Sequence, residues 1–150
     1  MTTTWVVVAH QTGARFMEHR SGFGRNLTFV SELHNPEGRL RNHEIETDRA
    51  GQSFTGGRGG GSPRAMPHEH TAHEHVVENF TRTIAEQLQR ARAEGSFDDL
   101  ILVAGPRFLG GLRSALDAPT AHKVVASVSK DLAQVPWNGI ANHIAEVLPL

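Results

Sequence analysis

The stretch Asp98-Asp-Leu-Ile-Leu-Val-Ala-Gly-Pro106 decides the fold of this chain. Its centre, residues 100–104, is an uninterrupted apolar run between two aspartates and a Gly-Pro pair. Such a run between breakers is typical of a strand that is buried on both faces of a sheet. Residues 5–9, Trp-Val-Val-Val-Ala, have the same character and end at a polar turn. We therefore predict two central strands that run parallel to each other.

A segment with helical periodicity precedes residues 100–104. Its apolar residues recur at steps of three and four along one face: Val76, Val77, Phe80, Ile84, Leu88 and Ala91. The opposite face is charged, as in a helix that packs on one side only. The pattern predicts a helix over about residues 67–94, with Glu69 and Glu74 near its start and Gly95 as its stop. A strand, this long helix and a second strand form a crossover unit.

The remaining patterns complete a single domain over residues 1–150. Leu27, Phe29 and Leu33 predict a strand in which the three side chains share one face. In chain order, we predict strands over residues 14–19 and 27–33, a helix over 107–116, a strand over 124–128 and a helix over 137–148. A meander followed by alternating helices and strands favours an α/β sheet with helices on its faces.

Composition limits the classes of function. With 150 residues, 38% of them apolar, the chain is large enough for one core without disulfides or metal. Its formal net charge of -1 argues against a globally basic nucleic-acid binder, so any RNA contact must be local. The chain has no cysteine, no signal-peptide pattern at its start and no run of about 18 apolar residues. We expect a soluble, cytoplasmic protein whose partners include neither a membrane nor DNA.

Residues 48–66 hold six glycines and three arginines between two well-patterned halves of the chain. A long Gly-rich segment inside a compact domain is either a binding element or a disordered loop. We predict a poorly ordered loop over about residues 44–67, in which guanidinium groups contact RNA phosphate and glycines permit close approach of the backbone. The predicted RNA-binding residues of this loop are Arg49, Gln52, Gly56, Gly57, Arg58, Gly59, Gly60, Gly61 and Arg64.

Four histidines lie close together in the stretch His68-Glu-His-Thr-Ala-His-Glu-His75. The spacing matches neither H-E-x-x-H, which needs a histidine in place of Ala72, nor H-x-x-E-H, which needs one in place of Thr71. Three interpretations stay open: a solvated polar start of the helix, a surface that faces RNA or a partner, and a metal site. We predict no structural metal and no cofactor.

The stretch Gly105-Pro-Arg-Phe-Leu-Gly-Gly-Leu-Arg113 places the start of a helix directly after a buried strand. Free backbone N–H groups at such a position attract anions, and Arg107 strengthens the attraction, so we add it to the predicted RNA-binding residues. An ordinary junction between a strand and a helix explains the same pattern. The stretch matches neither a Walker loop nor a dinucleotide fingerprint, and the chain has no G-x-S-x-G elbow. We therefore assign no catalytic residue.

A set of short motifs runs along nearly the whole chain. They are Trp5-Val-Val-Val-Ala9, Thr47-Asp-Arg-Ala-Gly-Gln52, Glu78-Asn-Phe80, Phe97-Asp-Asp-Leu-Ile-Leu-Val-Ala104 with the Pro-Arg that follows, Leu112-Arg113, and Lys130-Asp-Leu132 with Pro136. In this order and spacing they resemble the bacterial host attachment protein family. That family is grouped with bacterial relatives of the archaeo-eukaryotic class I release factor.

The resemblance implies a ribonuclease H-like fold, a mixed sheet of about five strands with helices on its faces, as in the middle domain of the release factor. In that domain a Gly-Gly-Gln loop precedes a long helix and reaches the ribosomal peptidyl-transferase centre. Here residues 56–61 read Gly-Gly-Arg-Gly-Gly-Gly, and the nearest glutamine is Gln52. We therefore expect a non-enzymatic domain that associates with the ribosome or with structured RNA, in ribosome rescue or hibernation.

Two alternatives from other classes stay open. One is a hydrolase that cleaves an ester such as peptidyl-tRNA, with Gln52 or backbone amides of the loop positioning water. The other is a protein-interaction domain connected with host attachment, which would bind a protein partner and no nucleic acid.

Overall fold

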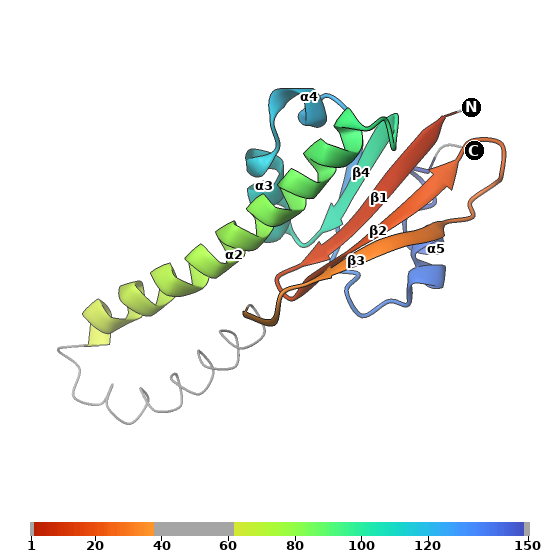
Figure 1. Cartoon of the computed structure of the whole chain (residues 1–150). Helices are drawn as coiled ribbons and strands as arrows, with labels where there is room; N and C mark the ends of the chain where they lie inside the picture. The colour runs from red at the N-terminus through yellow and green to blue at the C-terminus, as the bar shows by residue number, and fades with distance from the viewer. Residues whose placement is uncertain (1, 38–61, 149–150) are drawn as a thin grey trace.

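The computed structural model describes residues 2–37 and 62–148, with the backbone alone for residues 62–73. Five strands form one mixed sheet in the order β3-β2-β1-β4-β5 (Figure 1). β1 pairs antiparallel with β2, and β2 with β3, whereas β4 runs parallel to both β1 and β5. The predicted α/β sheet with two parallel central strands is confirmed. The strands are β1 (Thr3–His10), β2 (Gly13–Arg20), β3 (Thr28–His34), β4 (Asp99–Ala104) and β5 (Val124–Ser129).

Helical segments cover the two faces of the sheet (Figure 1). The long helix α2 (Ser62–Ala93) and helix α3 (Pro106–Ala115) pack on one face, and the short α4 (Ala118–Ala121) leads from α3 to β5. The segment after β5 packs on the other face and contains the 3-10 helix η2 (Trp137–Gly139) and α5 (Ile140–His143). The predicted strands before and after α2 and the helix over 107–116 are confirmed to within a few residues.

Each face of the sheet has its own hydrophobic core, because alternate side chains of a strand point to opposite faces. The side chains of residues 100–104 all have an exposed fraction of 0%, as expected for a strand buried on both faces. The core under α2 and α3 includes Val7, Phe16, Ile84, Leu88, Leu102 and Leu112. The core under α5 includes Val6, Met17, Ile101, Ile140 and Ile144.

The predicted common face of Leu27, Phe29 and Leu33 is wrong. Leu33 packs against the core under α2, whereas Leu27 packs against the core under α5. In the pairing of β2 with β3, the register shifts between Ser31 and Phe29 and leaves Val30 as an extra residue. A bulge of this kind adds one residue to the strand, so the side chains beyond it change faces.

α2 begins earlier than its pattern predicts. Residues 62–67 belong to the helix and not to the predicted loop, and the first turn, from Ser62, contains no acidic residue. Glu69 therefore lies beyond the first turn, and the predicted acidic start of the helix is wrong. The sequence of this part lacks the apolar pattern that starts at Val76, the first buried side chain described in α2. The end of α2 is as predicted, since Gly95 adopts a left-handed φ of 74°.

The single helix predicted over residues 137–148 is also wrong. Three residues of 3-10 helix in η2 and four residues of α-helix in α5 stand in its place. The N–H of Val147 donates to the carbonyl of Ile144, a three-residue span typical of 3-10 turns. Ile140, Ile144 and Leu148 are nevertheless buried, so their spacing correctly predicts an inward face.

Candidate functional site

A cleft of about 660 Å³ opens at the edge of the sheet where β1 and β4 end. This volume lies in the range of about 300–1,000 Å³ that is typical of small-molecule sites. The apolar lining consists of Ala9, Val77, Pro106 and Phe108. The polar lining consists of His10, Gln11, Glu74, Glu78, Arg107 and Asp131.

The topology of the sheet explains why a cleft forms here. β1 and β4 are parallel neighbours, yet the chain continues from β1 to β2 on one side and from β4 to β5 on the other. The two connections diverge and leave a crevice beyond the carboxyl ends of both strands. Open α/β sheets commonly bind their ligands at such a switch point. The position of the cleft therefore makes it a candidate site.

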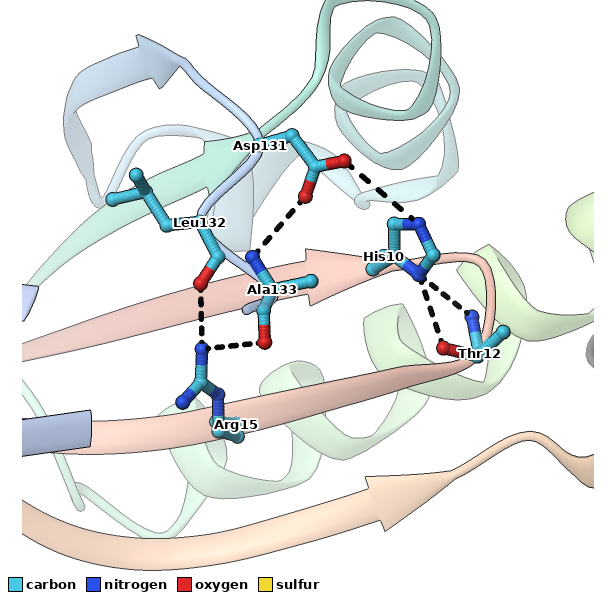
Figure 2. A network of polar contacts seen from close by, with 6 residues as sticks. All are labelled: His10, Thr12, Arg15, Asp131, Leu132 and Ala133. Atoms are coloured by element: carbon cyan, nitrogen blue, oxygen red, sulfur yellow. Dashed lines mark hydrogen bonds and ion pairs between the residues drawn. The ribbon is translucent and has the colours of Figure 1, made fainter. Parts of the chain in front are cut away.

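His10 is the last residue of β1, and the turn that follows fixes its ring (Figure 2). The backbone N–H of Thr12 donates to Nδ1 at 3.3 Å, and the Thr12 hydroxyl lies 3.0 Å from the same nitrogen. Because Nδ1 accepts, the hydrogen of the neutral imidazole is on Nε2. Nε2 faces Asp131, whose Oδ2 is 3.8 Å away.

Asp131 lies just after β5 and faces His10 across the edge of the sheet (Figure 2). Its Oδ1 accepts the backbone N–H of Ala133 at 3.1 Å, while Oδ2 is the oxygen nearer to His10. The separation of 3.8 Å is longer than a direct hydrogen bond. The side chains of His10 and Asp131 are 32% and 57% exposed, so both remain open to a ligand in the cleft.

Arg15 of β2 holds the segment that carries Asp131 (Figure 2). Its Nη2 donates to the carbonyl of Leu132 at 2.8 Å, and its Nη1 donates to the carbonyl of Val135 at 2.6 Å. Burial lowers the pKa of Arg15, but its guanidinium group stays charged at neutral pH. These bonds fix the backbone on both sides of the turn after Asp131 and thereby its distance from β1.

Carboxylates outnumber cations in the lining of the cleft. Glu74, Glu78 and Asp131 carry negative charge, and Arg107 carries positive charge. Arg107 is exposed in the first turn of α3. His75 Nδ1 lies 3.9 Å from Glu78 Oε2, at the rim of this group. The balance favours a ligand with an amino group or several hydrogen-bond donors over a polyanion.

The structure describes two of the predicted RNA-binding residues. Arg107 lines the cleft, and Arg64 lies in the first turn of α2, where the backbone alone is described. Of the poorly ordered loop predicted over about residues 44–67, residues 44–61 lie outside the described part of the chain. The same is true of Arg49, Gln52, Gly56, Gly57, Arg58, Gly59, Gly60 and Gly61.

The histidine cluster is described at His75 alone, whose side chain is 69% exposed. Among residues 2–37 and the side chains from 74 to 148, no three His, Cys, Asp or Glu residues are grouped so that they could hold a metal ion. The three interpretations of the cluster therefore stay open. Within the described chain, no helix is both long and apolar enough to cross a membrane.

Sequence reasoning missed the pairing of His10 with Asp131. The two residues are far apart in the chain, and the parallel order β1-β4-β5 brings the ends of their strands to one edge. A signal was present, because His10 directly follows the predicted strand over residues 5–9 and Asp131 comes three residues after the predicted strand over 124–128. The carboxyl ends of such strands meet at one edge, where polar side chains gather into a site.

Comparisons with known proteins agree with this fold. A family model described as "Protein required for attachment to host cells" matches residues 5–144. The crystal structure of an archaeal translation termination factor is similar, with a TM-score of 0.52 and 14% sequence identity. The similarity covers 97% of this chain and 35% of the factor, so this chain spans about a third of the factor's length. Among curated proteins, none matches this chain.

Proposed function

Because the chain belongs to the family of proteins required for attachment to host cells and shares the fold of a translation termination factor, we propose that it is a release-factor-like domain that associates with the ribosome or structured RNA. We infer ribosome rescue or hibernation as the process. The domain acts by binding and has no catalytic residue of its own in this proposal.

The projection of α2 beyond the sheet is the observation that carries this proposal (Figure 1). α2 has 32 residues, which at 1.5 Å per residue is about 48 Å. The strands have six to eight residues, or about 20–26 Å at 3.3 Å per residue. The N-terminal part of α2 extends past the sheet in Figure 1, and Val76 is the first buried side chain described in the helix. A helix that projects in this way is suited to reach into a crevice of a larger particle.

The distribution of positive charge supports an RNA surface as the target. The chain as a whole has a formal net charge of -1, which gives no general attraction to a polyanion. Arg49, Arg58 and Arg64 nevertheless lie within a short stretch that ends in the first turn of α2. Each guanidinium group offers a planar fork of donors for phosphate. The projecting half of α2 and this stretch therefore form the proposed contact.

Co-sedimentation with ribosomes at increasing salt tests the proposal. We expect the chain to sediment with ribosomes at low salt and to be released as salt rises, because phosphate contacts release counterions. Changing Arg49, Arg58 and Arg64 together to Ala should weaken association and lower its salt dependence by up to about three phosphate contacts. A separate prediction concerns the glycines. Gly56→Val with Gly57→Val should also weaken association, through bulk and lost backbone freedom, although the charge is kept.

A matched control uses three exposed arginines of the body: Arg20, Arg25 and Arg82, also changed together to Ala. This variant has the same net charge as the first triple variant and should keep its ribosome association. Equal weakening in both triple variants would contradict a local contact. Wild-type sedimentation of the first triple variant would contradict the phosphate contacts themselves.

A second candidate function is protein interaction connected with host attachment. The aromatic rings of Phe29 and Trp137 lie 6.2 Å apart, and their residues are 39% and 41% exposed, which favours a protein contact on that side of the sheet. No detectable ribosome association of the unaltered chain at low salt would reject the first proposal and favour this one.

A further inference from the structure

We propose that the cleft at the ends of β1 and β4 binds a short peptide of two or three residues with free amino and carboxyl termini. This proposal concerns a small ligand and does not depend on the binding of RNA. It follows from the kinds of polar group that line the cleft, from the sign of their charge and from the apolar surface between them.

His10 and Asp131 present a donor and an acceptor side by side. Since Nδ1 of His10 accepts the N–H of Thr12, Nε2 carries the hydrogen and is the donor. Oδ2 of Asp131 is the acceptor, 3.8 Å from Nε2. The nitrogen and the carbonyl oxygen of one extended residue point to the same side of a peptide and are a few ångströms apart. An amino-terminal residue thus fits this pair, with its ammonium group on Asp131 and its carbonyl on His10.

The charged side chains around His10 and Asp131 favour binding of the ammonium and carboxylate groups at the two ends of such a peptide. Glu74 and Glu78 add negative charge to that of Asp131, which favours an ammonium group over a phosphate. Arg107 is the cation of the described lining and matches a single carboxylate, for which a guanidinium fork is well suited. A ligand with one positive and one negative end fits this lining better than a nucleotide, which carries negative charge alone.

The apolar residues of the lining give the peptide's side chain a place to bind. Val77 lies on α2 and Phe108 lies on α3, and both line the cleft together with Pro106. A volume of about 660 Å³ accommodates a dipeptide or tripeptide and excludes a folded partner. The dipeptide Leu-Ala, with an apolar side chain at its amino-terminal residue, is therefore a suitable probe.

Isothermal titration of the full chain with Leu-Ala tests the proposal, with nuclear magnetic resonance shifts as a second readout. We expect saturable binding that is weakened about tenfold or more by acetylation of the amino group and by amidation of the carboxylate. Asp131→Asn keeps an oxygen for the N–H of Ala133 and should weaken Leu-Ala about tenfold. Arg107→Gln should weaken Leu-Ala but should not weaken the amidated peptide further, because the contact is already lost.

Matched controls are Glu86→Gln on α2 and Arg82→Gln, two exposed residues outside the cleft, and both should bind Leu-Ala like the unaltered chain. The capped peptides test the proposal even where a variant fails to fold. The proposal is overturned if Leu-Ala shows no saturable binding at millimolar concentration, if capping either terminus leaves the affinity unchanged, or if adenosine monophosphate binds in its place.

Discussion

The two halves of α2 are continuous in backbone and differ in what stabilises them. After Val76 the helix buries one face against the sheet, with Ile84 and Leu88 fully inside. Before Val76, the described side chains Glu74 and His75 are exposed, and this half extends past the sheet (Figure 1). An isolated helix of fewer than about 12–15 residues is marginal in water. Packing therefore stabilises the second half, and we expect the first half to depend on its continuity with the second.

The rate of amide hydrogen exchange should show the largest difference between the two halves of α2. We expect the slowest exchange in β4, whose residues 100–104 are fully buried, and slow exchange in α2 after Val76. Exchange before Val76 should be faster by orders of magnitude, because that half extends past the sheet (Figure 1). Mass spectrometry of the free protein measures the difference. Equally slow exchange along the whole helix would show that both halves are held alike.

Truncating a side chain of the packed half should have the next largest effect. Leu88 has an exposed fraction of 0% in the core under α2, so Leu88→Ala should lower the free energy of unfolding by about 2–5 kcal/mol. His75→Ala, in the exposed half, should change it by less than about 0.5 kcal/mol. Urea unfolding of both variants measures the contrast. Similar losses in the two variants would mean that the projecting half is also packed.

A pH-dependent contact at the end of the packed half should have a smaller effect. Asp117 caps α4 by accepting the N–H of Thr120 at 3.0 Å, and Arg92 of α2 donates to the Thr120 hydroxyl at 3.0 Å. The hydrogen bonds from Thr120, with Arg92 adding to them, lower the pKa of Asp117. Ionised Asp117 therefore stabilises the fold above its unfolded pKa of about 3.9, and this contribution is lost as the pH falls through the lower, folded value.

Asp117→Asn keeps a capping oxygen and removes the charge. We expect it to lower the free energy of unfolding at pH 7 and to have less effect at an acidic pH below the unfolded pKa, where the aspartate of the unaltered chain is increasingly protonated. Urea unfolding at both pH values gives the comparison, with Glu86→Gln as the exposed control. A difference that grows toward low pH would contradict the sign of the pKa shift.

Metal removal should have the smallest effect. All four histidines of residues 68–75 lie in α2 before Val76. We expect a chelator to leave the melting temperature unchanged. Thermal unfolding with and without ethylenediaminetetraacetate measures this. A large loss of stability that zinc restores would make the cluster a metal site and would give the projecting half a support of its own.

The elements that could be predicted are those whose signal is local. Residues 100–104 and 5–9 are uninterrupted apolar runs, and burial on both faces requires such runs whatever the rest of the chain does. The apolar pattern of α2 after Val76 likewise predicts the face of the helix that packs against the sheet. Before Val76 the sequence lacks this pattern, so the helix start at Ser62 could not be predicted from periodicity.

The features that escaped prediction depend on pairing between distant segments. The bulge at Val30 is a property of the register of β2 with β3 and has no glycine or proline to mark it. The cleft depends on the order of the strands, which places His10 beside Asp131. Arg107 could be identified as a candidate from its position after β4, but the carboxylates that surround it could not, because they come from α2 and from the segment after β5.

The cleft lies where α2 leaves the sheet. Glu74, Val77 and Glu78 line it, and Val76, which lies between them in the chain, is the first buried side chain described in the helix. From Val76 back to Ser62 the helix is a stiff lever about 21 Å long, and a tilt of about 10° at the cleft would carry its far end about 4 Å. A tilt of the helix at the cleft would therefore displace Ser62, the end that leads into the stretch of glycines and arginines, more than the residues of the cleft. Glu74, Val77 and Glu78, at the point where α2 leaves the sheet, are therefore also part of the lining of the cleft.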